Sequence, residues 1–218
     1  MVGNAGKREA RVLQAGAPLS RAKGAMIMLH GRGASGEDML RFAEVLAQPD
    51  FAILALQAEG RSWYPYSFLA PIERNEPYLS SSMLMLDGLL ARLTSAGLAV
   101  EQIILLGFSQ GACLALEYAA GHARRYGGIV GLSGGLIGPD GTPRHYSGHF
   151  YGTSVFLGCS DIDPHIPLAR VHETDRVLTT LGAVVMTKIY PGMGHSINDD
   201  EVAHIRGMLS KFELHLRT

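Results

Sequence analysis

Short apolar segments alternate with longer amphipathic segments along almost the whole chain, and this alternation limits the folds available to it. Residues 25–29 predict a buried strand, and residues 37–47 place apolar side chains at helical spacing before Pro49. Strands that are apolar throughout, each followed by a helix, predict an α/β fold with a mostly parallel sheet covered on both faces. The further predicted strands are 51–56, 102–106, 128–132, 154–157 and 183–190, and the further predicted helices are 78–95, 110–120, 168–181 and 200–216.

Two segments do not follow this alternation. Residues 60–77 are rich in aromatic residues and proline, and residues 134–152 are rich in glycine, so both are expected to be loops. A chain of 218 residues, 47% of them hydrophobic, can bury one sizeable core, whereas two domains would each be small. The sequence therefore predicts one domain over residues 1–218, in which residues 1–20 form an N-terminal extension or edge-strand region.

Composition excludes several classes of function. The net charge of −1 and the pI of about 6.8 provide no basic surface for nucleic acid or for an anionic membrane. The N-terminal residues lack the apolar core of a signal peptide, and no apolar run reaches the roughly 18 residues of a membrane span. Cys113 and Cys159 lie in apolar segments and are expected to be buried thiols. These features favour a soluble cytoplasmic protein.

The pattern Gly-x-Ser-x-Gly occurs twice, at Gly107–Gly111 and at Gly131–Gly135. Chance alone gives roughly 0.2 such matches in a glycine-rich chain of this length, so the context decides. The pattern carries a nucleophilic serine when a sharp strand-to-helix turn presents it beside a helix N-terminus. Ser109 lies between a predicted strand and a predicted helix, whereas a Gly- and Pro-containing segment follows Ser133. We therefore expect Ser109 to be the nucleophile and Ser133 to be a turn residue.

A serine nucleophile needs a base, and the base needs a third group that orients it. After an elbow of this kind the acid and then the histidine follow along the chain, each in a loop after a later strand. His195 lies in a glycine-bearing loop between the last predicted strand and the last predicted helix, and it is the expected base. Four other histidines lie in or at the end of a helix or in the glycine-rich loop: His122, His145, His149 and His172.

The loop after the strand 154–157 offers two aspartates, Asp161 and Asp163, as the acid. Asp163 precedes Pro164, which favours an extended backbone and a carboxylate presented at the tip of the loop. Asp161 is an alternative acid, or a residue that caps or braces the loop. The residues themselves favour Asp163 but do not exclude Asp161.

Stabilisation of an oxyanion requires two backbone N–H donors. One belongs to the residue after the nucleophile, which is Gln110, and the other to the loop after an early strand. The strand 25–29 ends in His-Gly-Arg-Gly, whose glycines allow an amide to turn inward, so Arg32 N–H is the second candidate. The alternative is an ordinary glycine-rich turn.

Together these segments resemble the phospholipase/carboxylesterase family of α/β-hydrolases, which includes the acyl-protein thioesterases. The resemblance implies an α/β-hydrolase fold with a minimal lid, and it makes the aspartate of Asp-Pro-x-[Val/Ile]-Pro the acid, which is Asp163. The matching segments are Leu29-His-Gly-Arg-Gly33, Gly107-Phe-Ser-Gln-Gly-Ala112, Asp163-Pro-His-Ile-Pro167 and Gly192-Met-Gly-His195.

The resemblance also bears on the substrate. The thioesterases of the family have His-Gly-Leu-Gly-Asp in the oxyanion loop, whereas this chain has Arg32 and Ala34 at the two differing positions, which resembles bacterial carboxylesterases. This difference favours a small-molecule ester over a palmitoylated protein. The resemblance further implies that the aromatic segment borders the substrate pocket, and ordinary core packing is the alternative interpretation. The pocket candidates are Trp63, Tyr64, Phe68 and Ile166.

The sequence thus predicts a carboxylesterase that cleaves a small-molecule ester through an acyl-Ser109 intermediate, without a metal or cofactor. An acyl-thioesterase or lysophospholipase with the same three residues is the first alternative. A non-catalytic relative that binds a ligand is the second, although such a protein would tolerate the loss of a residue of the triad and all three are present. The oligomeric state is left open, with a homodimer among the options.

Overall fold

Seven strands form one sheet in the order β1-β3-β2-β4-β5-β6-β7 in the computed structural model, which describes residues 11–215. All neighbouring strands are parallel except β1 and β3, which are antiparallel, so the predicted mostly parallel sheet is confirmed. The strands are β1 (Arg11–Gly16), β2 (Gly24–Leu29), β3 (Phe51–Gln57), β4 (Ile103–Phe108), β5 (Gly128–Leu132), β6 (Ser154–Ser160) and β7 (Val184–Tyr190).

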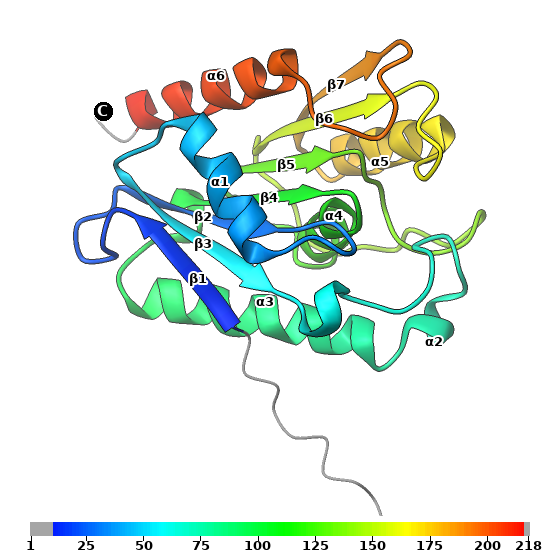
Figure 1. The fold of residues 1–218 in the computed structure, drawn as a ribbon, viewed down its shortest axis with the longest axis horizontal. Helices are drawn as coiled ribbons and strands as arrows, with labels where there is room; N and C mark the ends of the chain where they lie inside the picture. The colour runs from blue at the N-terminus through cyan, green and yellow to red at the C-terminus, as the bar shows by residue number, and fades with distance from the viewer. Residues whose placement is uncertain (1–10, 216–218) are drawn as a thin grey trace, which may run out of the picture.

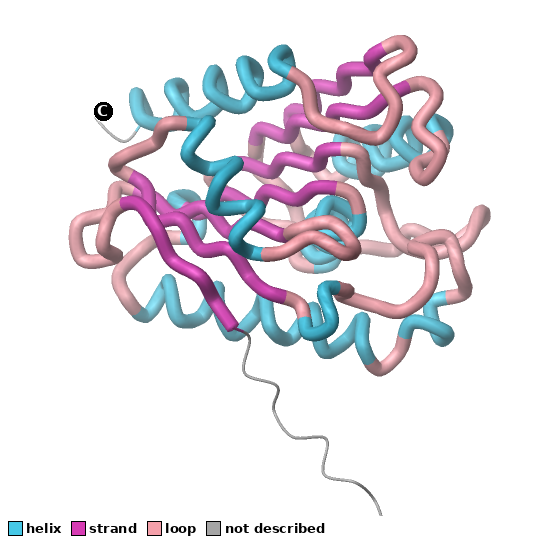
Figure 2. The backbone as a smooth tube through the Cα atoms, viewed as in Figure 1, coloured by secondary structure: helices cyan, strands magenta, loops and turns pink. Residues whose placement is uncertain are grey.

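Helices cover both faces of this sheet (Figure 1). Helices α1 and α6 lie over one face, and α3, α4 and α5 lie over the other, as the tube view also shows (Figure 2). The long helices are α1 (Gly36–Leu46), α3 (Tyr78–Ser95), α4 (Gln110–Gly121), α5 (Leu168–Thr180) and α6 (Asp199–His215), and the short ones are η1 (Glu59–Arg61), α2 (Ile72–Asn75) and η2 (Val100–Gln102).

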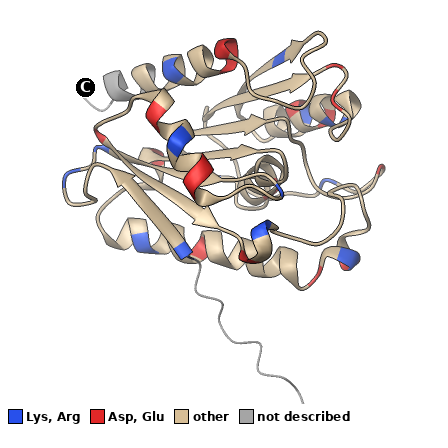
Figure 3. Ribbon diagram, in the orientation of Figure 1, with Lys and Arg blue, Asp and Glu red and all other residues tan. Residues whose placement is uncertain are grey.

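The central strands explain why the sheet is buried on both faces. β2 to β6 carry no charged side chain, and the charged residues lie on the helices, loops and outer strands (Figure 3). Two apolar clusters result, one beneath α1 and α6 and the other beneath α3, α4 and α5. Each buried Leu, Ile, Val or Phe contributes about 1.5–3 kcal/mol through removal from water, so these two clusters provide the main stabilisation of the fold.

One of the two segments predicted to be loops contains short helices. The segment 60–77, for which the sequence predicts a loop, contains most of η1 and the four-residue helix α2. A single helical turn is too short to show the apolar periodicity from which a helix is predicted. The segment 134–152 contains neither a strand nor a helix, apart from an isolated bridge from Gly148 to Ala123.

β1 lies at one edge of the sheet, inside the region where an extension or edge strand is expected. Residues 1–10 and the end of the last predicted helix, Leu216, lie outside the described residues. No helix in the described part of the chain is long and apolar enough to span a membrane. For the candidate site, the decisive feature is that β4, β6 and β7 run parallel, so the loops at their carboxyl ends meet at one edge of the sheet (Figure 1).

Candidate active site

Ser109 occupies the tight turn between β4 and α4. Its backbone has φ 55° and ψ −120°, a conformation that residues with a side chain rarely adopt. Such a conformation costs on the order of 1–3 kcal/mol and persists only where the surroundings enforce it. Here the Ser109 N–H donates to Leu132 O at the end of β5 (2.9 Å), and the Ser109 C=O accepts from Cys113 N–H in α4 (3.0 Å). The strand and the helix together therefore force the side chain out of the turn.

The two glycines of the pattern allow this turn to pack closely against β2. A Cβ atom at Gly111 would lie 2.2 Å from Leu29 O, and one at Gly107 would lie 2.3 Å from Gly111 O. Both contacts are with backbone atoms that cannot move aside, so any side chain at these positions would displace the turn or β2. The glycines are required because the end of β2, the end of β4 and the start of α4 meet here.

The three residues expected to form a triad lie together. His195 Nε2 lies 2.8 Å from Ser109 Oγ, and His195 Nδ1 lies 2.7 Å from Asp163 Oδ2. Because the carboxylate can only accept, Nδ1 carries the proton and Nε2 is left to accept from the serine hydroxyl. The Asp163 side chain is fully buried, whereas His195 is 18% exposed and can reach a bound molecule.

Asp163 is held as a carboxylate by several donors. Besides His195, the N–H groups of His165 (2.8 Å) and Ile166 (3.1 Å) donate to Oδ1, and the Cys159 thiol lies 3.8 Å from Oδ2. Burial alone raises the pKa of Asp163, but the hydrogen bonds from His195 and from the two amides outweigh it, so the pKa lies below its ordinary value. The residue therefore carries a negative charge directly behind the imidazole.

Asp161, the other candidate acid, has a different position. Its Oδ1 accepts from Gly192 N–H (2.8 Å), and Ser160 Oγ accepts from Gly194 N–H (3.1 Å). Both bonds join the loop after β6 to the loop that bears His195. Asp161 thus braces the loop, which is the alternative role open to it from the sequence. Within the described residues it makes no hydrogen bond to the imidazole ring, whose Nδ1 faces Asp163.

Ser133, in the second Gly-x-Ser-x-Gly pattern, also has a left-handed backbone (φ 48°) but is fully buried. Its N–H donates to Gly158 O (2.7 Å), and among the described residues the neighbour of its hydroxyl is the Cys159 thiol rather than a base. Loop rather than helix follows it, as expected. A buried hydroxyl without a neighbouring base cannot act as a nucleophile, so the structure separates the two serines.

Arg32 lies in the loop that follows β2, and Gln110 is the first residue of α4. In the described part of the chain neither N–H donates to another group. Amides at the start of a helix lack an intrahelical acceptor and attract negative charge. Among the described residues, both N–H groups therefore remain without an acceptor.

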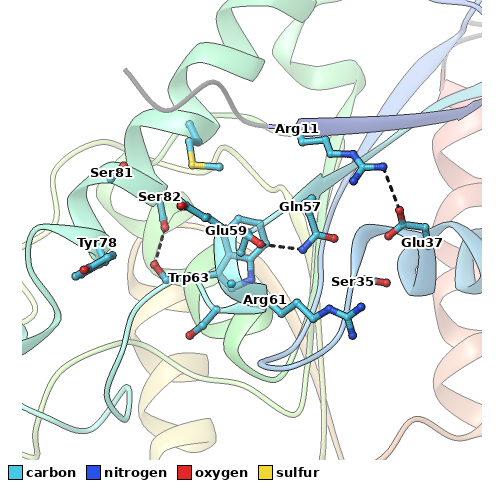
Figure 4. Close-up of a pocket in the computed structure, with 14 residues that line it drawn as sticks. Arg11, Ser35, Glu37, Gln57, Glu59, Arg61, Trp63, Tyr78, Ser81 and Ser82 are labelled. Atoms are coloured by element: carbon cyan, nitrogen blue, oxygen red, sulfur yellow. Dashed lines mark hydrogen bonds and ion pairs between the residues drawn. The ribbon is translucent and has the colours of Figure 1, made fainter. Parts of the chain in front are cut away.

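The four predicted pocket residues are buried. Trp63, Tyr64 and Phe68 are each no more than 6% exposed and belong to the apolar core, and Ile166 is 3% exposed. Of these, Trp63 lines a cleft of about 830 Å³ that lies between α3, the start of α1 and η1 (Figure 4). Its indole N–H donates to His30 O (2.7 Å), so Trp63 also supports the loop that bears Arg32.

Sequence reasoning missed a buried group near the imidazole loop. Glu201 in α6 is fully buried, and its Oε2 accepts from Asn198 N–H while Glu201 N–H donates to Asn198 Oδ1 (both 2.9 Å). The other oxygen lies against β6, since a Cβ at Gly158 would be 2.1 Å from Oε1. The spacing Asn198-x-x-Glu201 is that of a capping box, so the start of the helix was predictable from sequence although the burial was not.

Comparison with known proteins identifies the family. The sequence profile of the phospholipase/carboxylesterase family matches residues 12–213. The chain belongs to this family. The resemblance drawn from the four motifs is therefore confirmed, and with it the assignment to the serine hydrolases of the α/β-hydrolase fold.

Individual members of the family and of the fold are similar over nearly their whole length. Acyl-protein thioesterase 1 of Saccharomyces cerevisiae is 30% identical, over 91% of this chain and 97% of the yeast protein. The crystal structure of a phospholipase/carboxylesterase from Dyadobacter fermentans is 42% identical, with a TM-score of 0.90 over 92% of this chain and 97% of its own. Bacillus cereus carboxylesterase shares the fold at 21% identity (TM-score 0.76, covering 94% and 95%).

The buried Glu201 gives this member of the phospholipase/carboxylesterase family a testable dependence of stability on pH. Burial, with a smaller contribution from the charge of Asp200, raises the pKa of Glu201 to about 7, although the Asn198 N–H opposes the shift. Between pH 4.5 and 7 the unfolded chain loses this proton while the folded chain keeps it, so the free energy of unfolding falls as the pH rises.

We expect Glu201→Gln to remove this loss, because the amide keeps an acceptor for Asn198 and does not ionise. As the pH rises from 4.5 to above 7, the free energy of unfolding of the variant should increase relative to that of the wild type by an amount on the order of 3 kcal/mol. This follows from about 1.4 kcal/mol per unit of pKa difference between the folded and unfolded chains. Urea unfolding at several pH values measures this difference. Glu44→Gln, at an exposed position of α1, is the control. A difference between Glu201→Gln and wild type that does not vary with pH would contradict the expectation.

Proposed function

We propose that the protein hydrolyses carboxylic esters through a covalent acyl-Ser109 intermediate, with His195 as general base and acid and Asp163 as the residue that orients it. The proposal rests on the unbroken chain of hydrogen bonds from Ser109 Oγ through the imidazole to the buried carboxylate. Membership of a family of serine hydrolases supports it. The proposed steps use only residues of this chain and water.

In the first half of the reaction, Ser109 Oγ attacks the carbonyl carbon of the ester while His195 Nε2 takes the hydroxyl proton. The carbonyl oxygen becomes an oxyanion, which accepts hydrogen bonds from the N–H groups of Arg32 and Gln110. The imidazolium is stabilised by the charge of Asp163. The bond to the alcohol then breaks, the imidazolium protonates the departing oxygen, and the acyl group remains on the serine.

In the second half, a water molecule takes the place of the alcohol. His195 removes its proton as the water oxygen attacks the acyl carbon, and the same two amides stabilise the second oxyanion. Collapse of this intermediate returns the proton to Ser109 and releases the carboxylic acid. Each proton thus passes through one nitrogen, Nε2, which faces the serine hydroxyl at 2.8 Å.

A small-molecule ester is the proposed substrate. Arg32 and Ala34 occupy the two positions of the oxyanion loop at which this chain differs from the thioesterase pattern, and the relative from Dyadobacter fermentans is named phospholipase/carboxylesterase. Hydrolysis of an acyl thioester is the second candidate, favoured by the similarity to the yeast acyl-protein thioesterase. Both reactions use the same three residues and differ in the leaving group.

Replacement of the serine tests the mechanism. Ser109→Ala should lower kcat on a p-nitrophenyl ester by roughly 10⁴-fold or more, because no nucleophile remains. Ser133→Ala is the matched control and should keep activity within a few-fold of the wild type, measured on protein with an unchanged circular dichroism spectrum. Full activity of Ser109→Ala would disprove the acyl-serine mechanism.

A panel of substrates separates the two candidate reactions. We expect kcat/KM to be higher for p-nitrophenyl acetate and butyrate than for the palmitate, and higher for the oxygen ester than for the corresponding thioester. The same panel includes a lysophospholipid. A preference for the palmitoyl thioester over every oxygen ester would instead assign the protein to the thioesterases of its family.

The two aspartates of the loop after β6 provide a third test. Asp163→Asn should lower kcat by roughly 10⁴-fold, because the amide no longer fixes the tautomer of His195. Asp161→Asn loses the acceptor for Gly192 N–H but leaves the imidazole bonded to its carboxylate, so a loss of roughly 10-fold or less is expected. Initial rates with one ester measure both variants. A larger loss in Asp161→Asn would reverse the assignment of the acid.

A further inference from the structure

The side chain of Arg32 holds a loop rather than pairing with an acid. Its Nη1 donates to Pro65 O (2.8 Å), and its Nη2 donates to Tyr64 O (2.9 Å) and Tyr66 O (2.7 Å). Three consecutive carbonyls thus converge on one guanidinium. No carboxylate lies within ion-pair distance of Arg32 in the part of the chain that the structure describes. The planar guanidinium directs N–H groups from two nitrogens at these three acceptors in fixed directions, whereas a lysine ammonium carries its three donors on one nitrogen of a flexible chain and does not reproduce this geometry.

The same loop is also held by the residue that follows the nucleophile. We call residues 62–66 the aromatic loop. Gln110 Oε1 accepts from Trp63 N–H (3.0 Å), and Gln110 Nε2 donates to Tyr64 O (2.7 Å). Arg32 and Gln110 are the two residues whose backbone N–H groups face the oxyanion in the proposed reaction. The side chains of both residues therefore form hydrogen bonds with the same loop, while in the proposed reaction their backbone N–H groups donate to the oxyanion.

The aromatic loop is in turn anchored on its far side. Asn75, which is fully buried in α2, accepts from Tyr66 N–H (2.9 Å) and donates to Ser67 O (3.0 Å). The indole of Trp63 donates to His30 O, two residues before Arg32. The aromatic loop is thus held from several sides. Arg32 itself lies between Gly31 and Gly33, and the Gly33 N–H donates to Arg61 O (2.8 Å).

We propose that Arg32 is a positioning residue, whose guanidinium fixes the direction of its own backbone N–H by tying the oxyanion loop to the aromatic loop. This inference rests on the proposed function. Glycine on both sides of Arg32 gives the amide conformational freedom, and the three contacts with the carbonyls restrict it together with the hydrogen bond from Gly33 N–H to Arg61 O. An amide that is already aligned costs no reorganisation when the oxyanion forms. The guanidinium of Arg32 therefore stabilises the transition state and contributes to kcat rather than to the binding of the substrate.

Two substitutions distinguish positioning from charge. Arg32→Met removes the charge and the three contacts, whereas Arg32→Lys keeps the charge but lacks the planar fork of N–H groups that makes these three contacts. We expect both to lower kcat on p-nitrophenyl butyrate by roughly 10- to 100-fold while KM changes less than about 3-fold. Both should also weaken inhibition by a trifluoromethyl ketone, whose adduct carries the oxyanion, by a similar factor.

The loop itself can be observed because Trp63 is the single tryptophan of the chain and is buried. If the contacts of Arg32 hold the aromatic loop, both variants should show stronger quenching of tryptophan fluorescence by acrylamide than the wild type. Arg206→Met is the matched control, since Arg206 also donates to a backbone carbonyl, Val45 O, but joins α6 to the end of α1 remote from Ser109. This control should leave kcat and quenching unchanged.

The outcomes are separable. Wild-type kcat in Arg32→Lys would overturn the proposal, because charge alone would then suffice, and so would a change confined to KM in either variant. If a variant unfolds, thermal denaturation reveals it, and the fluorescence comparison is then made with the variant that remains folded. Failure of the proposed function looks different, since the wild type itself would neither hydrolyse the ester nor bind the trifluoromethyl ketone.

Discussion

The backbone conformation of Ser109 is the constraint on which the rest of the site depends. A residue with a side chain avoids φ 55° and ψ −120°, and it keeps this conformation here because β5 accepts its N–H and α4 donates to its C=O. Two glycines without side chains let the turn press against the end of β2, with no room for a single added carbon. The stability of the central sheet is thus what holds a reactive hydroxyl out of the turn, beside the first free amide of α4 and the loop that bears Arg32.

The acidic groups near the imidazole of His195 differ in their pKa values. Asp163 is ionised because His195 and two backbone amides donate to it, and it faces the ring directly. Burial raises the pKa of the Cys159 thiol to about 12, so the thiol stays neutral beside that carboxylate. Glu201, buried against Gly158 with one oxygen unpaired in the described structure, has a pKa of about 7 for the same reason. The carboxylate that faces the imidazole directly is therefore that of Asp163, and in the proposed reaction its charge stabilises the imidazolium.

Much of this arrangement is predictable from the sequence, because it depends on the order of segments along the chain. Parallel strands place the loops after β4, β6 and β7 at one edge, so Ser109, an aspartate and His195 had to meet there. The choice between Asp161 and Asp163 cannot be made from the order of segments, because it depends on which carboxylate faces the imidazole of His195, more than thirty positions away along the chain. The contacts of Arg32 with the aromatic loop and the burial of Glu201 likewise arise from packing between segments that are distant in the sequence. A local sequence pattern does not predict such packing.

The central claim is that Ser109 is the nucleophile, and covalent labelling tests it most directly. The folded protein is treated with a fluorophosphonate, which reacts with serines activated by a neighbouring base, and the adduct is located by mass spectrometry of peptides. We expect one adduct per chain, on Ser109, that is absent from Asp163→Asn over the same time and from protein unfolded before treatment. Labelling of Ser133 or of any other residue in place of Ser109, or an unlabelled Ser109 in folded protein, would contradict the account.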